Sequence, residues 1–252
     1  MHTFFRRIRK GLLDGGKIRR YLIYAIGEIL LVVVGILIAL QINNWNEQSK
    51  LDKQEQQILK NLKQDFNHNH EEILKVITDN NATIDSAFII LNNTGNKYKK
   101  GFKINNLLGD VAGTIYFYPK NGFLYDLINS GNLSIIKNNR LRNLLSSWLP
   151  TLEDLSLREK NAKEFENKII EYVIKNGSWL SVDQVDDDET IRRLKFPDSG
   201  FDVNNNLLLQ SVEFENMIEN QIVFIELVNE RLELCLTLNR EIQGMIEDQI
   251  KK

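Results

Sequence analysis

The stretch YLIYAIGEILLVVVGILIALQI, residues 21–42, decides how this chain is organised. It contains a single charged side chain, Glu28. About 20 consecutive apolar residues are enough for a helix to cross the hydrocarbon core of a bilayer. A cleavable signal peptide has a shorter apolar core followed by an A-x-A-like site, whereas the residues that follow here read NNWNE. The pattern therefore predicts an uncleaved transmembrane helix over residues 21–42.

The charges that flank this helix predict its orientation. Residues 1–20 carry seven Lys or Arg against Asp14 alone, a net charge of 7 − 1 = +6. The first residues beyond the helix mix both signs. Positive flanks stay on the cytoplasmic side. We therefore expect a single-pass protein of the cytoplasmic (inner) membrane, with the basic residues 1–20 inside and residues 43–252 outside.

Two further features of the flanks concern the membrane surface. Aromatic side chains gather at the two interfaces of a bilayer, and three are expected to act as interface anchors here: Tyr21, Tyr24 and Trp45. Residues 1–20 themselves form either a basic amphipathic helix on anionic headgroups or an unstructured flank that only sets topology. Gly15 and Gly16 interrupt any such helix, so both interpretations stay open.

The composition excludes several classes of protein. Hydrophobic residues make up 42% of the 252 residues, and 32 Lys and Arg nearly balance 34 Asp and Glu, for a net charge of -2. This balance argues against intrinsic disorder and against a partner that is a nucleic acid. One Cys cannot build a disulfide scaffold, and one long apolar run does not make a polytopic transporter. An anchored chain with one globular domain, or at most two, remains.

Two blocks of this sequence resemble a known family. FFRRIRKGLLDGGKIRRYLIYAIGEILLVVVGILIALQINNWNE, Phe4 to Glu47, is similar to the N-terminal signature of a family of uncharacterised bacterial proteins. YDLINSGNLSIIKNNRLRNLL, Tyr125 to Leu145, resembles the pattern in the middle of the same family more loosely. The resemblance implies a single-pass membrane protein with a helical extracytoplasmic region. It implies no catalytic residues, and it leaves the function open.

The predicted transmembrane helix carries a candidate surface for helix association. Gly27, Gly35 and Ala39 are spaced at multiples of four residues, and Gly35-x-x-x-Ala39 is a small-xxx-small pair that allows two backbones to approach closely. Glu28 lies on the same side as Gly35 and is costly in an apolar span. These four residues suggest self-association or contact with a partner helix. The alternative is an ordinary anchor in which the Glu28 carboxylate reaches the membrane–water interface. The sequence leaves both interpretations open.

The region beyond the membrane is predicted to be all-α. Apolar residues at helical spacing run from Leu51 to Leu91, which predicts one long helix from the anchor to about Asn93. A second long apolar face runs from Phe214 to Ile246, with Gln221 and Asn239 at its polar positions. A broad face of this kind suits burial in a bundle. We therefore expect an antiparallel helical bundle in which the long first and last helices pack together.

Shorter elements are expected between these two helices. The expected helices cover about 103–112, about 121–129 with Gly131 as its left-handed stop, a helix capped by Asn138, another that starts at Pro150 and ends near Lys175, and 190–195. Residues 114–118, TIYFY, favour a strand by composition, but a lone strand is unstable. We predict an extended connector there.

The sequence offers little material for catalysis or metal binding. His68 and His70 point to different sides of a helix, which favours solvated residues over a metal site. The acidic residues of 183–189 lack the spacing of a calcium loop and favour stabilisation of a helix N-terminus. Cys235 lies on an apolar face and is expected to be a buried thiol. We predict no catalytic residue, no metal site and no cofactor.

The leading hypothesis is a non-enzymatic, membrane-anchored module that binds a protein partner or forms a homo-oligomer, as a scaffold at the bacterial cell envelope. The alternative is an extracytoplasmic sensor that binds a small molecule and works through a membrane partner. Four aromatic residues are candidates to line its pocket, although core packing explains them equally well: Trp148, Trp179, Tyr116 and Tyr118. An enzyme that uses carboxylates alone is a third option, which needs two facing carboxylates in a cleft.

Overall fold

The computed structural model describes residues 17–113 and 115–250, and every regular element within these ranges is a helix. The predicted all-α class is confirmed. The elements are α2 (Lys17–Leu91), η1 (Gly95–Lys97), α3 (Asn105–Val111), α4 (Gly122–Asn129), η2 (Asn132–Ile135), α5 (Asn139–Asn176), α6 (Leu180–Asp183), α7 (Glu189–Leu194), η3 (Asn205–Gln210) and α8 (Val212–Glu247).

Helix α2 runs without interruption through 75 residues and ends at Leu91, close to the predicted end at Asn93. The chain divides into two compact units, one that ends at Gln56 and one that comprises Gln57–Lys252. The predicted boundary at residue 42 follows hydropathy, whereas the second compact unit begins at residue 57. The predicted character of residues 1–16 lies outside the described residues.

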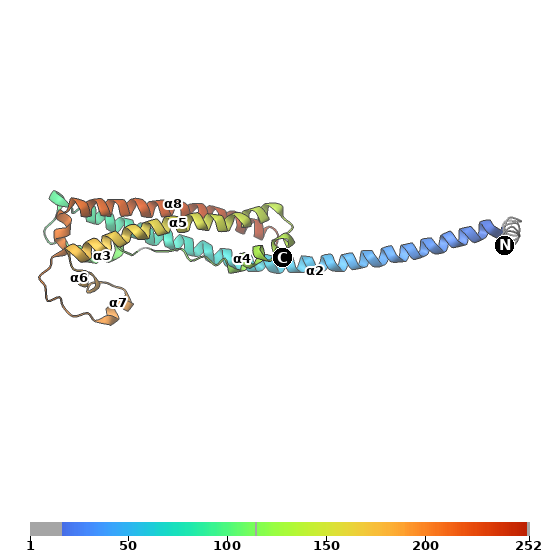
Figure 1. Cartoon of the computed structure of the whole chain (residues 1–252), viewed down its shortest axis with the longest axis horizontal. Helices are drawn as coiled ribbons and strands as arrows, with labels where there is room; N and C mark the ends of the chain where they lie inside the picture. The colour runs from blue at the N-terminus through green and yellow to red at the C-terminus, as the bar shows by residue number, and fades with distance from the viewer. Residues whose placement is uncertain (1–16, 114, 251–252) are drawn as a thin grey trace, which may run out of the picture. The chain divides into compact units, whose positions relative to one another are not determined.

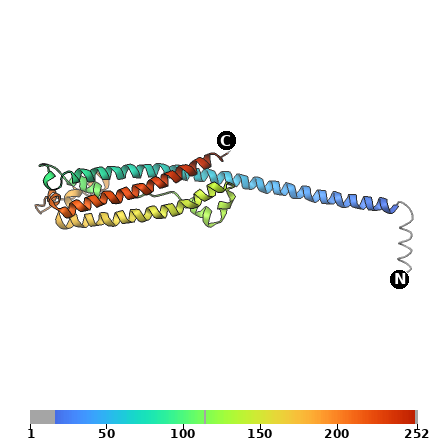
Figure 2. The same ribbon diagram turned by 90° about the horizontal axis from the view of Figure 1, so that it is seen from above.

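The second unit is a bundle of three long helices. Figures 1 and 2 show the later part of α2 side by side with α5 and α8, and α8 runs opposite to the other two. Three contacts tie α2 to α8 in this antiparallel register. Asn80 donates to Asn229 Oδ1 at 2.8 Å, Asn239 donates to the Phe66 carbonyl at 3.0 Å, and Lys63 pairs with Glu247 at 2.8 Å. The predicted packing of the first and last helices is therefore confirmed.

An extended segment takes the place of a fourth helix. Residues 115–121 lie along α2 and α5 and include no strand, as predicted for the connector. Asn69 of α2 holds the backbone of Lys120 with two hydrogen bonds of 2.7 and 3.0 Å. The Phe117 N–H donates to Glu159 Oε1 of α5 at 2.9 Å. Because this segment returns the chain to the end where α2 enters the bundle, α5 runs parallel to α2.

The hydrophobic core forms two clusters that follow each other along the bundle. One contains Phe66 and Trp148, whose ring centroids lie 5.1 Å apart, together with Cys235. The other contains Ile169 and Phe214. Between them lies a layer of buried polar side chains from all three long helices: Asn80, Thr83, Glu166, Gln221 and Asn229. Each helix therefore interrupts its apolar face at the same level of the bundle.

The predicted helix start at Pro150 is wrong. Helix α5 is continuous from Asn139 to Asn176 and contains Pro150. Pro150 cannot donate a hydrogen bond to the carbonyl of Ser146, but both residues lie on the exposed side, where water can bind that carbonyl. Trp148 and Leu155 are buried on the other side of the same helix. Packing on both sides of the proline thus holds the helix together.

The predicted helix ends are largely confirmed. The Asn138 side chain caps α5 by accepting from the Leu141 N–H at 3.1 Å. Gly131 follows α4 with a φ of 74°, a left-handed conformation that favours glycine. The short helix α6 was not expected from the sequence, because four residues carry too little periodicity to predict it.

Candidate functional site

The longest exposed apolar surface of the described chain lies on α2. Large apolar side chains between Leu22 and Ile42 are 44–74% exposed, and none packs against another part of the chain. Helix α2 is long and apolar enough to cross a membrane because it contains this stretch. An apolar surface of this length needs lipid or another helix to cover it. It is the first candidate site.

The four candidate association residues all lie on this exposed stretch. A Cβ atom placed on Gly27 or Gly35 would meet nothing within 4 Å, so neither glycine is needed for packing inside the chain. Seven residues separate Glu28 from Gly35 and eleven separate it from Ala39, so these three share one side of a helix within about 20°. Gly27 lies about 100° away from Glu28 and borders that side. Of the four candidate residues, Glu28, Gly35 and Ala39 therefore share one side of α2, and Gly27 borders it.

The predicted interface anchors are described only in part. Trp45 lies on α2 just beyond the apolar stretch and is 74% exposed. Tyr21 and Tyr24 lie in the same helix, but their side chains are outside the described residues. Trp45 therefore has the position and exposure of an anchor on one flank of the apolar stretch.

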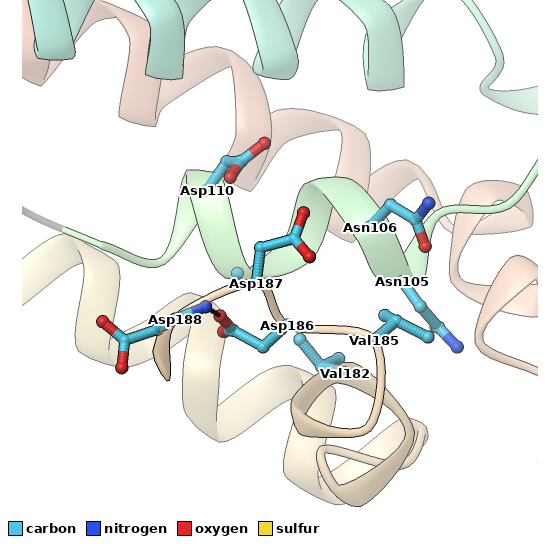
Figure 3. Close-up of a pocket in the computed structure, with 9 residues that line it drawn as sticks. Asn105, Asn106, Asp110, Val182, Val185, Asp186, Asp187 and Asp188 are labelled. Atoms are coloured by element: carbon cyan, nitrogen blue, oxygen red, sulfur yellow. Dashed lines mark hydrogen bonds between the residues drawn. The ribbon is translucent and has the colours of Figure 1, made fainter. Parts of the chain in front are cut away.

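A second candidate is an acidic hollow of about 240 Å³ between α3 and the segment that precedes α7. Figure 3 shows Asp110 and Asn106 of α3 on one side and Asp186, Asp187 and Asp188 on the other. No group of three or more His, Cys, Asp or Glu among the described residues is placed to hold a metal ion. The lining of this hollow is mostly polar, with four aspartates and two asparagines.

The aspartates of this hollow serve the local backbone. Asp186 accepts from the Asp188 N–H at 2.7 Å, and Asp188 accepts from the N–H groups of Thr190 and Ile191 at 2.7 and 3.2 Å. The hydrogen bonds from Ile191 and Thr190 lower the pKa of Asp188 below its ordinary value. Asp188 is the N-cap of α7, which agrees with the predicted role of the acidic residues at a helix N-terminus.

The buried carboxylates of α5 were not predicted. Glu159 accepts from the Phe117 N–H, and Glu166 is fully buried with Lys163 Nζ at 2.5 Å. Burial raises the pKa of Glu159, and the hydrogen bond from Phe117 opposes this rise. Both glutamates lie at helical spacing from the apolar Leu155, Ala162 and Ile169. That spacing was the available signal that they face the core.

The other singled-out residues do not form a common site. His68 and His70 are half-buried, on either side of the buried Asn69. Cys235 is fully buried, as predicted, and burial together with the charges of Glu159 and Asp154 raises its pKa to about 12. A thiol with this pKa stays protonated and is a poor nucleophile at neutral pH.

The four aromatic candidates for a ligand pocket lie in different places. Trp148 is in one core cluster and Trp179 packs against the other. The rings of Tyr116 and Tyr118 lie 6.2 Å apart on the extended segment, where Tyr118 is largely exposed. Core packing thus accounts for the two tryptophans, and the four rings do not converge on one pocket.

Comparison with known proteins assigns the chain to no characterised group. No curated protein and no solved structure matches it. A match to a family model covers the end of the block Phe4 to Glu47 and the whole of the block Tyr125 to Leu145. Residues 28–151 match the model of a family of unknown function (DUF6090), which confirms the predicted resemblance to an uncharacterised family.

Proposed function

We propose that this protein is a single-pass, membrane-anchored helical module that associates with another membrane protein or with a second copy of itself, without catalysis of its own. The observation that carries the proposal is the exposed apolar stretch of α2, which no other part of the described chain covers. The basic residues 1–20 orient the anchor with its N-terminus in the cytoplasm. The bundle of residues 57–252 then lies outside the cytoplasmic membrane.

The association step rests on the side of α2 that carries Glu28, Gly35 and Ala39. Helices in lipid associate through close backbone approach at small residues and through polar contacts between helices. Glu28 is costly in a span unless it finds a polar partner or the interface. A partner helix against this side would place its backbone on Gly35 and Ala39 and a polar group near Glu28.

Crosslinking in native membranes tests this association. We would compare the wild-type chain with a Glu28→Leu, Gly35→Leu double variant. The matched control is a Leu30→Ile, Leu37→Ile variant, whose substitutions lie about 180–200° around the helix from Glu28. We expect specific crosslinked bands that disappear only in the first variant. Bands that persist in both variants would show that the anchor is only a tether.

A ligand sensor is the alternative function. The four aromatic residues that were candidates to line its pocket do not converge, so they do not form that pocket. The hollows described in the bundle have volumes of about 230–310 Å³, and each has aspartate side chains in its lining. Small-molecule sites are usually larger and mostly apolar. Stabilisation of the full chain by a small molecule in a thermal-shift screen would favour the sensor over the association module.

A further inference from the structure

The buried positions of the three long helices follow one repeat, which alternates steps of four and three residues. The repeat runs from Leu59 to Ile90 on α2, and from Leu141 to Val173 on α5, where Leu152 is half-buried. On α8 it comprises Phe214, Ile218, Gln221, Ile225, Val228, Leu232, Cys235, Asn239, Ile242 and Ile246. A heptad repeat of this kind packs helices along one seam. Because the pattern returns every seven residues, it alone also allows α8 to pack after a shift of one heptad, roughly 10 Å along the bundle.

A cluster of three asparagines between α2 and α8 distinguishes these alignments. Asn80 of α2 donates to Asn229 Oδ1 at 2.8 Å, and Asn229 donates in turn to Asn81 Oδ1 at 3.1 Å. The side chains of Asn80 and Asn229 are buried. A shift of α8 by one heptad would bring Asn229 level with Ile73 or with Ala87, according to the direction of the shift. In either case both hydrogen bonds are lost and a buried amide lies beside an apolar side chain.

Two other polar side chains in the repeat of α8 do not distinguish the alignments. Asn239 donates to the backbone carbonyl of Phe66 at 3.0 Å, and a carbonyl group recurs on α2 after every seven residues. Gln221 is fully buried, and its side-chain amide has no hydrogen-bond partner among the described residues. Among the buried amides of α8, the alignment therefore depends on Asn229.

We propose that the pair Asn80–Asn229 is the contact that holds α8 in one register, and that α8 slides by a heptad along the bundle once this pair is removed. A buried polar group left without its partner shifts an equilibrium roughly 5- to 150-fold, whereas ion pairs between exposed side chains, such as Lys63 with Glu247, are worth little. The connection from α5 to α8, residues 177–211, contains no helix longer than six residues and is long enough to follow such a movement. The pair lies within the bundle, so its role is independent of the membrane anchor.

The test measures the register of α8 in the full chain, in detergent, with pairs of introduced cysteines and a short thiol crosslinker. Lys63→Cys with Glu247→Cys reports the described register, since these two side chains are in contact. Lys63→Cys with Arg240→Cys reports a shift of one heptad in one direction, and His70→Cys with Glu247→Cys reports a shift in the other. Cys235 is buried and stays unlinked. A crosslinked band of monomer size on a gel distinguishes linkage within one chain from linkage between two copies.

Each cysteine pair is combined with either of two matched sets of amide-to-leucine substitutions. We expect the Asn80→Leu, Asn229→Leu variant to crosslink in the described register and in at least one shifted register. The control, Gln221→Leu with Asn239→Leu, should crosslink in the described register alone, as should the chain without leucine substitutions. Linkage of the first variant in the described register only, or shifted linkage in the control, would overturn the proposal.

Thermal unfolding separates selection of the register from support of the fold. Replacement of both partners of a buried polar pair by apolar side chains is often nearly neutral or stabilising. The Asn80→Leu, Asn229→Leu variant should therefore unfold at the same temperature as the unsubstituted chain or at a higher one. A lower unfolding temperature, or failure of the variant to fold, would mean that the pair supports the bundle instead of selecting its register, and would also overturn the proposal.

Discussion

At the scale of single residues, Glu159 is the side chain whose replacement is most informative. Its carboxylate is buried and accepts from the Phe117 N–H at 2.9 Å. Glu159→Ala leaves this buried N–H without an acceptor, which should cost about 1–3 kcal/mol of stability. Glu159→Gln keeps an acceptor oxygen and should be much milder. Thermal unfolding of the full chain in detergent compares the two variants, and an equal loss in both would contradict the assigned hydrogen bond.

The same residue predicts how stability depends on pH. Burial raises the pKa of Glu159 above its ordinary 4.5, so the folded chain holds this proton more tightly than the unfolded chain. The stability that Glu159 contributes is therefore fully present below pH 4.5 and is lost as the pH rises through the folded pKa. Glu159→Gln removes this loss. Unfolding curves between pH 4.5 and neutrality should fall less steeply for the variant, and parallel curves would refute the assignment.

Cys235 gives a second prediction at this scale. Its thiol is fully buried, and its pKa is raised to about 12. A thiol reagent needs both access and thiolate, so the native chain should not react at mildly alkaline pH. Reaction should begin only when the bundle unfolds in denaturant. Rapid labelling of the native protein would show that the core around α8 is open.

At the scale of elements, Pro150 tests why α5 is continuous. Proline is about 3 kcal/mol less favourable than alanine inside a helix, and glycine about 1 kcal/mol less favourable. Pro150→Ala should therefore raise the stability of the bundle by up to about 3 kcal/mol, and Pro150→Gly by less. Denaturant unfolding would give both values. A loss of stability in both variants would mean that the proline is needed where it lies.

The elements also show which parts of the fold can be predicted from sequence. The apolar faces of α2 and α8 predict two long packed helices because their spacing persists over many turns. Pro150 misleads because local propensity cannot register the packing of Trp148 and Leu155 on either side. Glu159 and Glu166 were missed because charged residues are normally exposed. Their burial depends on the extended segment, whose position no local pattern predicts.

At the scale of the whole molecule, the candidate site was predictable for a different reason. A long apolar run specifies an environment, so residues 21–42 predict a membrane helix without any knowledge of the fold. The residues that would give a chemical function are not brought together: the acidic hollow supports the N-terminus of α7, and the aromatic candidates belong to separate parts of the bundle.

The central claim is that residues 21–42 anchor the protein and that the bundle lies outside the cytoplasmic membrane. One labelling experiment on the full chain tests this claim most directly. A Ser199→Cys variant, with the buried Cys235 as internal control, is exposed to a membrane-impermeant maleimide in intact bacterial spheroplasts, and the membranes are then washed with alkaline carbonate. We predict that position 199 is labelled before lysis and that the protein stays in the membrane pellet. Labelling only after lysis, or release of the protein by carbonate, would contradict the account.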